Sequence, residues 1–431
     1  MKYRRLLVAV PLLWLAACGD SGTTTNTDAR DARLDTGGID NRTDTAPTDT
    51  PVDGTPPPVD APADLAADGG TLPDGATDDG GDGGGAAGQD GAVADGPKPQ
   101  RLVRTLLVVD ELPDAGGGDA GADGPKSPVV DPNLVNPWGL AFNTAGPLWT
   151  ANAGKGLSTA YSSQGAILAA VVTIPLAAGE TAPSAPTGIA FNPATSFMSD
   201  RFIFVSEGGL IAGWQSGATA VTRVDNASSM ASYKGLAIAT RNNVPRLYAT
   251  DFHNGKVDVY DQAYVKLTTT GGFADPNLPA GYAPFGIAAN GAVVYVSYAK
   301  QDAAKADDVK GAGNGYVNVF DFDGVLARRL VSNGALNSPW GLAIAPGDFG
   351  TLSHTLLVGN FGDGKINAYD ATTGAYVSTV IDTAGAPLVI DGLWSLVFGN
   401  DTTGAAHNQL FFTAGPGDEA HGVLGRLDFV P

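Results

Sequence analysis

The chain has 431 residues, of which 59 are glycine and 29 are proline, and 43% of its residues are hydrophobic while only 16% are charged. This composition is typical of many short strands joined by tight turns, because helices need more Leu, Glu and Lys. The formal net charge of −20 excludes nucleic acid as a partner, since binding it depends on Lys and Arg side chains that neutralise phosphates.

Residues 1–17 are predicted to be a lipoprotein signal peptide. Lys2, Arg4 and Arg5 give it a positive start, and the apolar stretch that follows is too short to span a bilayer. The sequence Leu-Ala-Ala-Cys that ends at Cys18 resembles the bacterial lipobox, in which the cysteine is lipidated and becomes the first residue of the mature chain. An ordinary secretory signal is the alternative, but Cys18 is the only cysteine of the chain and stands at the cleavage point.

We therefore expect the protein to be anchored to a membrane of the cell envelope through lipid on Cys18 alone. Asp20 is separated from the cysteine by one residue, so the usual inner-membrane retention signal is absent and the outer membrane is favoured, on its periplasmic or surface side. Once this cysteine is acylated, the folded part has no thiol for a disulfide, a zinc site or a nucleophile.

Residues 18–100 are predicted to form a disordered tether. Residues 19–100 contain 17 Asp, no Glu and four basic residues, with almost no large apolar side chain, so they cannot bury enough surface to offset their chain entropy. The Asp spacing lacks the Gly and terminal Glu of a calcium-binding loop, which favours a solvated spacer. A second acidic patch, residues 114–124, is interpreted as a loop insertion.

A short apolar motif, built around a Gly or Ser between bulky residues, occurs six times in the rest of the chain. The intervals between successive copies are 49, 47, 51, 55 and 54 residues, which suits a four-stranded β-propeller blade. The copies are residues 137–142, 186–191, 233–238, 284–288, 339–344 and 393–398.

Each copy is followed by a second apolar strand and by a third strand with period-two alternation. Five repeats add a fourth strand, as at residues 166–174. An aromatic-Asp pair at the end of the third strand starts a hairpin turn, where Asp bonds the backbone two residues on. We interpret these recurring residues as structural rather than catalytic: Asp261, Asp321, Asp370 and Asp428.

The sixth repeat ends after its third strand, and the missing strand is predicted upstream. Residues 101–110 are an apolar stretch with no repeat of their own, and pairing them beside residues 422–429 would remove the last open edges. The predicted fold class is all-β: a six-bladed β-propeller over residues 101–431, closed by an N-terminal outer strand and preceded by the signal peptide and the disordered acidic linker.

Four phrases in the repeat region, at residues 136–140, 299–302, 359–364 and 413–416, resemble those of an uncharacterised bacterial family of predicted six-bladed β-propeller, NHL-like exported proteins. The resemblance covers the whole repeat region. More distantly, the architecture is similar to the regucalcin and gluconolactonase class of calcium-dependent lactonases. The metal ligands of that class do not align with this chain residue by residue, so this likeness concerns the fold.

In a propeller, the connections between second and third strands and those between blades emerge on one face, around the channel mouth. Oxygen ligands at the second-strand ends, above all Glu207, Asp251 and Asn360, would suit a hard cation such as Ca²⁺; the alternative is that they cap tight turns. The candidate ligand-binding residues on this face are Trp138, Asn152, Glu207, Asp251, His253, Asp302, Asp307, Trp340, Asn360, Asp363, Trp394, Asp418, Glu419 and His421.

The connection at residues 300–315 is much longer than its counterparts and mixes three Asp with three Lys residues. Long loops in compact domains are usually functional or mobile, and we expect this one to act as a partial lid; the alternative is a solvated helical turn. The three Trp residues could stack on sugar rings, or alternatively fill space between blades.

Nucleophile elbows, phosphate loops, zinc motifs and dinucleotide fingerprints do not occur in the sequence. The favoured function is a cell-envelope lipoprotein whose propeller face binds an unidentified protein or carbohydrate ligand, as a monomer and with no cofactor unless the carboxylates hold Ca²⁺. The alternative is a calcium-dependent, lactonase-like hydrolase that acts at the channel mouth.

Overall fold

The computed structural model describes residues 100–112 and 127–429. The predicted signal peptide, Cys18, nearly all of the tether and the acidic patch at 114–124 lie outside these residues, so those expectations stay predictions. Nearly all regular structure in the described part is β-strand, and no helix there is long and apolar enough to cross a membrane.

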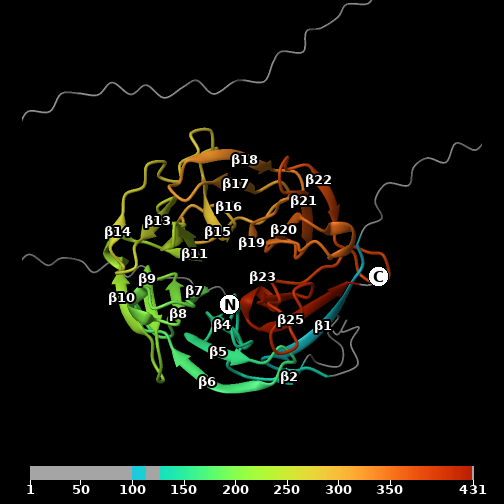
Figure 1. Cartoon of the computed structure of the whole chain (residues 1–431), viewed down its shortest axis with the longest axis horizontal. Coiled ribbons are helices and arrows are strands. Elements are labelled where there is room, and N and C mark those ends of the chain that lie inside the picture. Colours follow the sequence, from blue (N-terminus) through green and yellow to red (C-terminus); the bar gives the residue numbers. More distant parts are fainter. Residues whose placement is uncertain (1–99, 113–126, 430–431) are drawn as a thin grey trace, which may run out of the picture. The chain divides into compact units, whose positions relative to one another are not determined.

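Six sheets stand around a central axis as the blades of a β-propeller, which confirms the predicted fold class (Figure 1). The chain passes around the ring blade by blade, and the first strand of each repeat lies nearest the axis. These innermost strands coincide with the six repeated motifs. They are β3 (Pro137–Phe142), β7 (Pro186–Phe191), β11 (Tyr233–Arg241), β15 (Tyr282–Asn290), β19 (Pro339–Ile344) and β23 (Leu393–Phe398).

The remaining strands follow outward in chain order within each blade. The second strands are β4 (Leu148–Asn152), β8 (Phe202–Ser206), β12 (Val244–Asp251), β16 (Val293–Lys300), β20 (Thr355–Asn360) and β24 (Leu410–Ala414). The third strands are β5 (Leu157–Tyr161), β9 (Leu210–Trp214), β13 (Lys256–Tyr260), β17 (Tyr316–Phe320), β21 (Ile366–Asp370) and β25 (Val423–Phe429). The outer strands of the first five blades are β6 (Ile167–Thr173), β10 (Val221–Asp225), β14 (Lys266–Leu267), β18 (Leu326–Ser332) and β22 (Tyr376–Thr379). Short helical turns occur at η1 (Phe197–Ser199), η2 (Ala227–Ser229), η3 (Gly350–Leu352) and α1 (Pro416–Glu419).

The N-terminal strand closes the ring in the predicted way. Strand β1 (Leu102–Val109) pairs antiparallel with β25, so that Leu102 lies opposite Phe429 and Val109 lies opposite Val423. The two-residue strand β2 (Val129–Val130) pairs parallel with the other edge of β1. The last blade is therefore built from both ends of the described chain.

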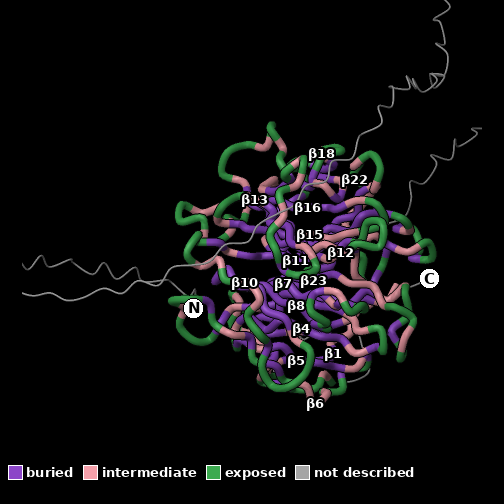
Figure 2. The backbone as a smooth tube through the Cα atoms, turned by 60° about the vertical axis from the view of Figure 1, so that its left-hand side comes forward, coloured by how far each residue is buried: buried purple, intermediate pink, exposed green. Residues whose placement is uncertain are grey.

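The glycine of the repeated motif allows the innermost strands to lie close together. A Cβ atom on Gly139 would stand 2.6 Å from the carbonyl oxygen of Thr187 in the next blade, and one on Gly341 would stand 2.5 Å from that of Trp394. A Cβ at these glycine positions would push neighbouring blades apart, which explains why five of the six motifs have Gly here; the sixth has the small residue Ser395. Buried residues follow the inner strands of each blade, whereas the outer strands and the turns are largely exposed (Figure 2).

Candidate functional site

Each innermost strand begins at the same end of the channel and places one side chain there, just before its Gly or Ser. Several of these side chains meet across the axis: the ring centroid of Trp138 lies 6.3 Å from that of Phe285 and 6.1 Å from that of Trp340. The aromatic ones are buried, so they close this end of the channel. The six equivalent positions hold Trp138, Thr187, Lys234, Phe285, Trp340 and Trp394.

Phe252 and Phe361, from the connections between second and third strands, complete this closure. Trp394 is fully buried and stacks against both Trp138 and Phe361, at 3.5 Å and 3.8 Å between ring centroids. Trp394 thus stacks on Trp138 and on Phe361, whereas Trp340 contacts Trp138 and Trp394 in edge-to-face arrangements. We call this set the aromatic plug; it consists of Trp138, Phe252, Phe285, Trp340, Phe361 and Trp394.

Lys234 is the one charged residue among the six equivalent positions, and it is fully buried. Its Nζ atom forms an ion pair with Glu207, lies 3.7 Å from the carboxylate of Asp307, and stands 5.2 Å from the ring centroid of Trp138. Burial acts to lower the pKa of Lys234, but the carboxylates of Glu207 and Asp307 outweigh it and hold this pKa above its ordinary value. The amino group therefore stays charged inside the channel mouth.

The connection at residues 300–315 reaches over the aromatic plug from the fourth blade. Its Gln301 side chain donates a hydrogen bond to the carbonyl oxygen of Phe252 at 2.6 Å, and Lys310 Nζ lies 4.2 Å from the ring centroid of Phe361. Asp302 accepts hydrogen bonds from the loop's own backbone, including Ala306 N at 2.9 Å. The loop thus brings charged side chains to the channel mouth, consistent with the predicted lid position.

Asp308, also in this loop, holds a polar atom without a partner. Its Oδ2 atom and the Oγ atom of Ser338 are both buried, and neither forms a hydrogen bond of good geometry, although the Ser338 hydroxyl lies near enough to act on the Asp308 carboxylate as a donor. Burial raises the pKa of Asp308, against the opposing effects of the nearby Ser338 hydroxyl and Lys234. A buried polar atom without a partner is rare in proteins, because it has lost its hydrogen bonds to water without replacement.

Glu419, on the short turn α1, is the fourth carboxylate near Lys234. It accepts a hydrogen bond of 2.9 Å from Asn136 Nδ2, and Asn136 Oδ1 in turn accepts one of 3.0 Å from Trp394 Nε1. Burial and the negative charge of Glu207 raise the pKa of Glu419 to about 7. Glu419 can therefore gain or lose a proton near neutral pH. We call the four carboxylates the acidic rim: Glu207, Asp307, Asp308 and Glu419.

Three residues at the channel mouth have a left-handed backbone conformation. Asn136 and Ser338 each have a φ of 47°, and Glu419 has a φ of 69°. Side chains other than glycine rarely adopt this region, and such strain persists mainly where function requires the geometry. These residues come from three separate connections, and left-handed residues also occur in turns elsewhere in the propeller.

The three residues predicted to hold Ca²⁺ have separate partners. Glu207 pairs with Lys234, whereas Asp251 accepts a hydrogen bond of 3.1 Å from Ser232 N and lies 3.2 Å from Lys256 Nζ. Asn360 donates to the carbonyl oxygen of Ala335 at 2.8 Å. In the part of the chain that the structure describes, no three His, Cys, Asp or Glu side chains are grouped to hold a metal. The present arrangement does not fit a shared cation, and the Ca²⁺ site stays a prediction.

The remaining candidate residues do not belong to the acidic rim. Asn152 is buried and donates to the carbonyl oxygen of Asn133 at 2.9 Å, while Asp363 lies 3.3 Å from Lys365 Nζ. His421 Nδ1 is 3.2 Å from a carboxylate oxygen of Asp110, at the end of the closing strand. Asp418 is exposed, and the backbone oxygen of His253 accepts a long hydrogen bond from Gln301.

Sequence reasoning missed Lys234, Asp308 and Asn136. The sequence does contain a signal for Lys234, because aligning the six motifs gives Trp, Thr, Lys, Phe, Trp and Trp at one position. A lysine in that column indicates a buried charge that needs partners. Nothing in the local sequence distinguishes Asp308 from its neighbour Asp307, since the burial of Asp308 depends on how the loop folds over the channel.

Known relatives were found by sequence comparison, although no family model matches the chain. Two uncharacterized proteins of Acanthamoeba polyphaga mimivirus, R648 and L690, are each 34% identical to it, over 320 and 322 residues. The match covers 69% of this chain in both cases, with 76% of R648 and 81% of L690. Since these relatives are viral, the bacterial family indicated by the motifs stays a prediction.

Several solved structures share the fold. Virginiamycin B lyase from Staphylococcus aureus, as a catalytically inactive variant with quinupristin, is 14% identical, covers 76% of this chain and 96% of its own, and has a TM-score of 0.44. A glucose dehydrogenase is 15% identical, with 68% and 96% covered and a TM-score of 0.46. A gluconolactonase from Xanthomonas campestris is 17% identical, with 57% and 86% covered and a TM-score of 0.37. At these identities the likeness concerns the fold alone.

Proposed function

We propose that this chain, which belongs to one family with the mimivirus proteins R648 and L690, is a cell-envelope binding protein whose channel mouth takes a ligand with a positively charged group. The observation that carries the proposal is the buried Asp308 Oδ2 atom, which has no hydrogen-bond partner. A ligand ammonium group would supply the missing donor and the missing positive charge.

The charge balance of the channel mouth favours a cation. The acidic rim has four carboxylates, against the two ammonium groups of Lys234 and Lys310. Two members of the rim can be reached from solvent, because the side chain of Asp307 is 65% exposed and that of Glu207 is 30% exposed. A cationic group could therefore approach over Asp307 and Glu207 and displace the proton that Glu419 carries near neutral pH.

Calorimetric titration of the mature chain tests this function. Glucosamine and a lysine tripeptide present ammonium groups on a carbohydrate and on a peptide, whereas N-acetylglucosamine is a neutral control and CaCl₂ tests the predicted metal site. We expect heat with an ammonium compound that is lost in Asp308→Asn and kept in Asp363→Asn, a carboxylate of the same face that lies beside Lys365. Equal heats in the two variants, or no heat with any compound, would contradict the proposal.

One observation favours an enzyme as the second candidate. Glu419 combines a pKa of about 7 with a strained backbone and a hydrogen bond to Asn136, which are properties of groups that transfer protons in catalysis. A lactonase-like hydrolase would then use Glu419 as its proton-transfer group. Hydrolysis of a sugar-lactone panel that disappears in Glu419→Gln would establish it, and the absence of turnover would leave binding as the function.

A further inference from the structure

We propose a second site in the axial channel, below the aromatic plug, that binds an unbranched aliphatic chain with a neutral polar head. This inference is independent of the proposed function, because it uses none of the acidic rim. It rests on two adjoining cavities between the innermost strands, of about 130 Å³ and 270 Å³.

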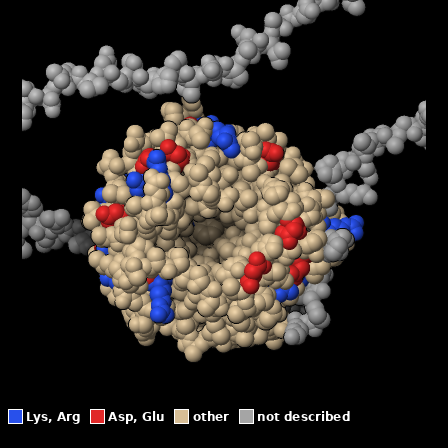
Figure 3. Space-filling view, in the orientation of Figure 1, with Lys and Arg blue, Asp and Glu red and all other residues tan. Residues whose placement is uncertain are grey.

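The two cavities form one passage along the axis. The smaller is lined by residues from all six innermost strands and ends at Trp340 of the aromatic plug. The larger lies among β15, β16, β19, β20 and β23. Ala288, Leu342, Leu396 and Val397 line both, so a chain-like ligand could extend from one into the other. In the face shown in Figure 3, the ring is hollow at its centre, and acidic side chains lie to one side of the hollow.

The walls are apolar and uncharged. Asp, Glu, Lys, Arg and His are absent from both linings, and the polar residues there are Ser395 in the smaller cavity, Asn290 and Tyr295 in the larger, and Trp340. An apolar chain gains free energy when it leaves water to pack against these apolar side chains, whereas a charged group would lose its hydration without a counter-charge. The ligand body is therefore aliphatic.

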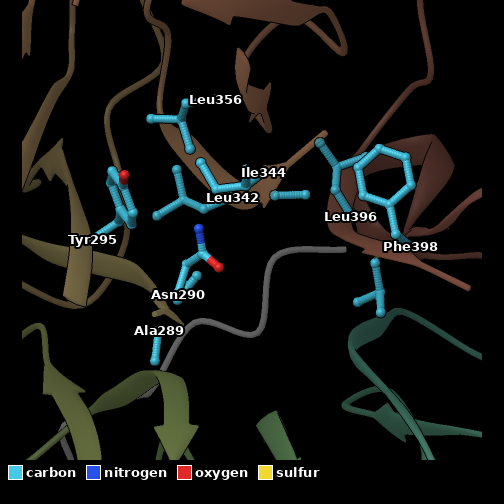
Figure 4. Close-up of a pocket in the computed structure, with 11 residues that line it drawn as sticks. Ala289, Asn290, Tyr295, Leu342, Ile344, Leu356, Leu396 and Phe398 are labelled. Atoms are coloured by element: carbon cyan, nitrogen blue, oxygen red, sulfur yellow. The ribbon is translucent and has the colours of Figure 1, made fainter. Parts of the chain in front are cut away.

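Asn290 provides the polar end of the site. It is exposed at the end of β15, and Figure 4 shows its amide turned toward Leu342, with Tyr295 beside it and Leu396 and Phe398 across the cavity. An amide can both donate and accept a hydrogen bond. Since the lining contains no basic residue that would pair with a carboxylate, a neutral head such as an alcohol fits better than a fatty-acid anion. A few convergent polar groups in an apolar pocket are typical of small-molecule sites.

Binding of 1-octanol and octanoate to the full mature chain at neutral pH tests the site, with calorimetry as the readout. We expect octanol to bind at least tenfold more tightly than octanoate. Ala288→Leu fills the junction of the two cavities and should weaken octanol binding at least tenfold, while Ala169→Leu, on the exposed outer strand β6, adds the same volume elsewhere and should leave it unchanged. Equal affinity of octanol for these two variants would overturn the inference, as would equal or tighter binding of octanoate.

A second variant covers the case in which Ala288→Leu fails to fold. Leu342→Ala enlarges both cavities, and it should shift the preference from octanol toward dodecanol at least threefold relative to the unmodified chain. An unchanged preference in a folded Leu342→Ala protein would also overturn the inference. Asp308→Asn should bind octanol normally, so the failure of this site and the failure of the channel-mouth function can be told apart.

Discussion

At the scale of single residues, Lys234 explains why charged groups gather at the channel mouth. It occupies a position at which the other blades have Trp, Phe or Thr, and its buried ammonium group would be costly without counter-charges. Glu207 and Asp307 supply these charges. Their side chains come from two other blades, so the ion pairs also tie those blades together.

Two substitutions test this interpretation of Lys234. We expect Glu207→Gln to lower the free energy of unfolding by about 2 kcal/mol, because the buried ammonium group of Lys234 loses its direct ion-pair partner. Lys234→Met should cost less, since it replaces the buried charge with an apolar side chain of similar length. Lys365→Met, at an exposed pair, is the control and should change stability by under about 1 kcal/mol. Urea denaturation that ranks Lys234→Met as the more damaging variant would contradict the account.

The raised pKa of Glu419 predicts a pH dependence. The folded protein holds a proton on Glu419 up to about pH 7, whereas the unfolded chain releases it near the ordinary value of about 4.3. The folded state therefore binds more protons between these values, and its stability should fall as pH rises from about 5 to 7. Because water screens part of the effect, we expect Glu419 to account for a loss of about 1–2 kcal/mol.

Thermal unfolding of the unmodified chain and of Glu419→Gln across this range is the measurement. Other carboxylates titrate as well, so the difference between the two proteins carries the information. As pH rises from about 5 to 7, the unmodified chain should lose stability relative to Glu419→Gln. Parallel pH profiles for the two proteins would show that Glu419 keeps its ordinary pKa.

At the scale of secondary-structure elements, local sequence patterns were sufficient to predict the fold. Gly139 and the four equivalent glycines mark the innermost strands because close strand contact leaves no room for a Cβ at them, and Asp261 and Asp321 start hairpin turns by accepting from the backbone N–H two residues on. Both effects act over a few residues. The site depends on the charge interaction between Glu207 and Glu419, which are more than two hundred residues apart, and sequence periodicity carries no information about it.

Strand β1 gives the element-scale prediction. Leu102 and Val108 are fully buried, Leu102 against the fifth blade and Val108 against the first, and removing large buried side chains costs about 2–5 kcal/mol each for Leu and less for Val. We expect the double variant Leu102→Ala, Val108→Ala to lose about 4 kcal/mol in urea denaturation. Val129→Ala on the exposed strand β2 is the control. A midpoint for the double variant equal to that of the control would remove β1 from the closing role.

At the scale of the whole molecule, we expect a lipid anchor and an acidic spacer to precede the propeller. The anchor depends on Cys18, and a lipid there would hold the chain on a membrane even though its described part contains no helix that could cross one. Cys18→Ser should therefore move most of the protein from the membrane fraction to the soluble fraction of the cells that produce it. Equal membrane retention of the variant would contradict the lipid anchor.

We propose that the channel mouth binds a cationic group. Asp308 is the residue on which this binding function depends, whereas the hydrolase alternative depends on Glu419. A crystal structure of the chain soaked with glucosamine tests it most directly. The binding account predicts the ammonium nitrogen within hydrogen-bond distance of Asp308 Oδ2, beside Glu207 and Glu419, with N-acetylglucosamine absent from that position in a matched soak. An ammonium group bound elsewhere, or an Asp308 Oδ2 atom satisfied by Ser338 while the mouth stays free of ligand, would contradict it.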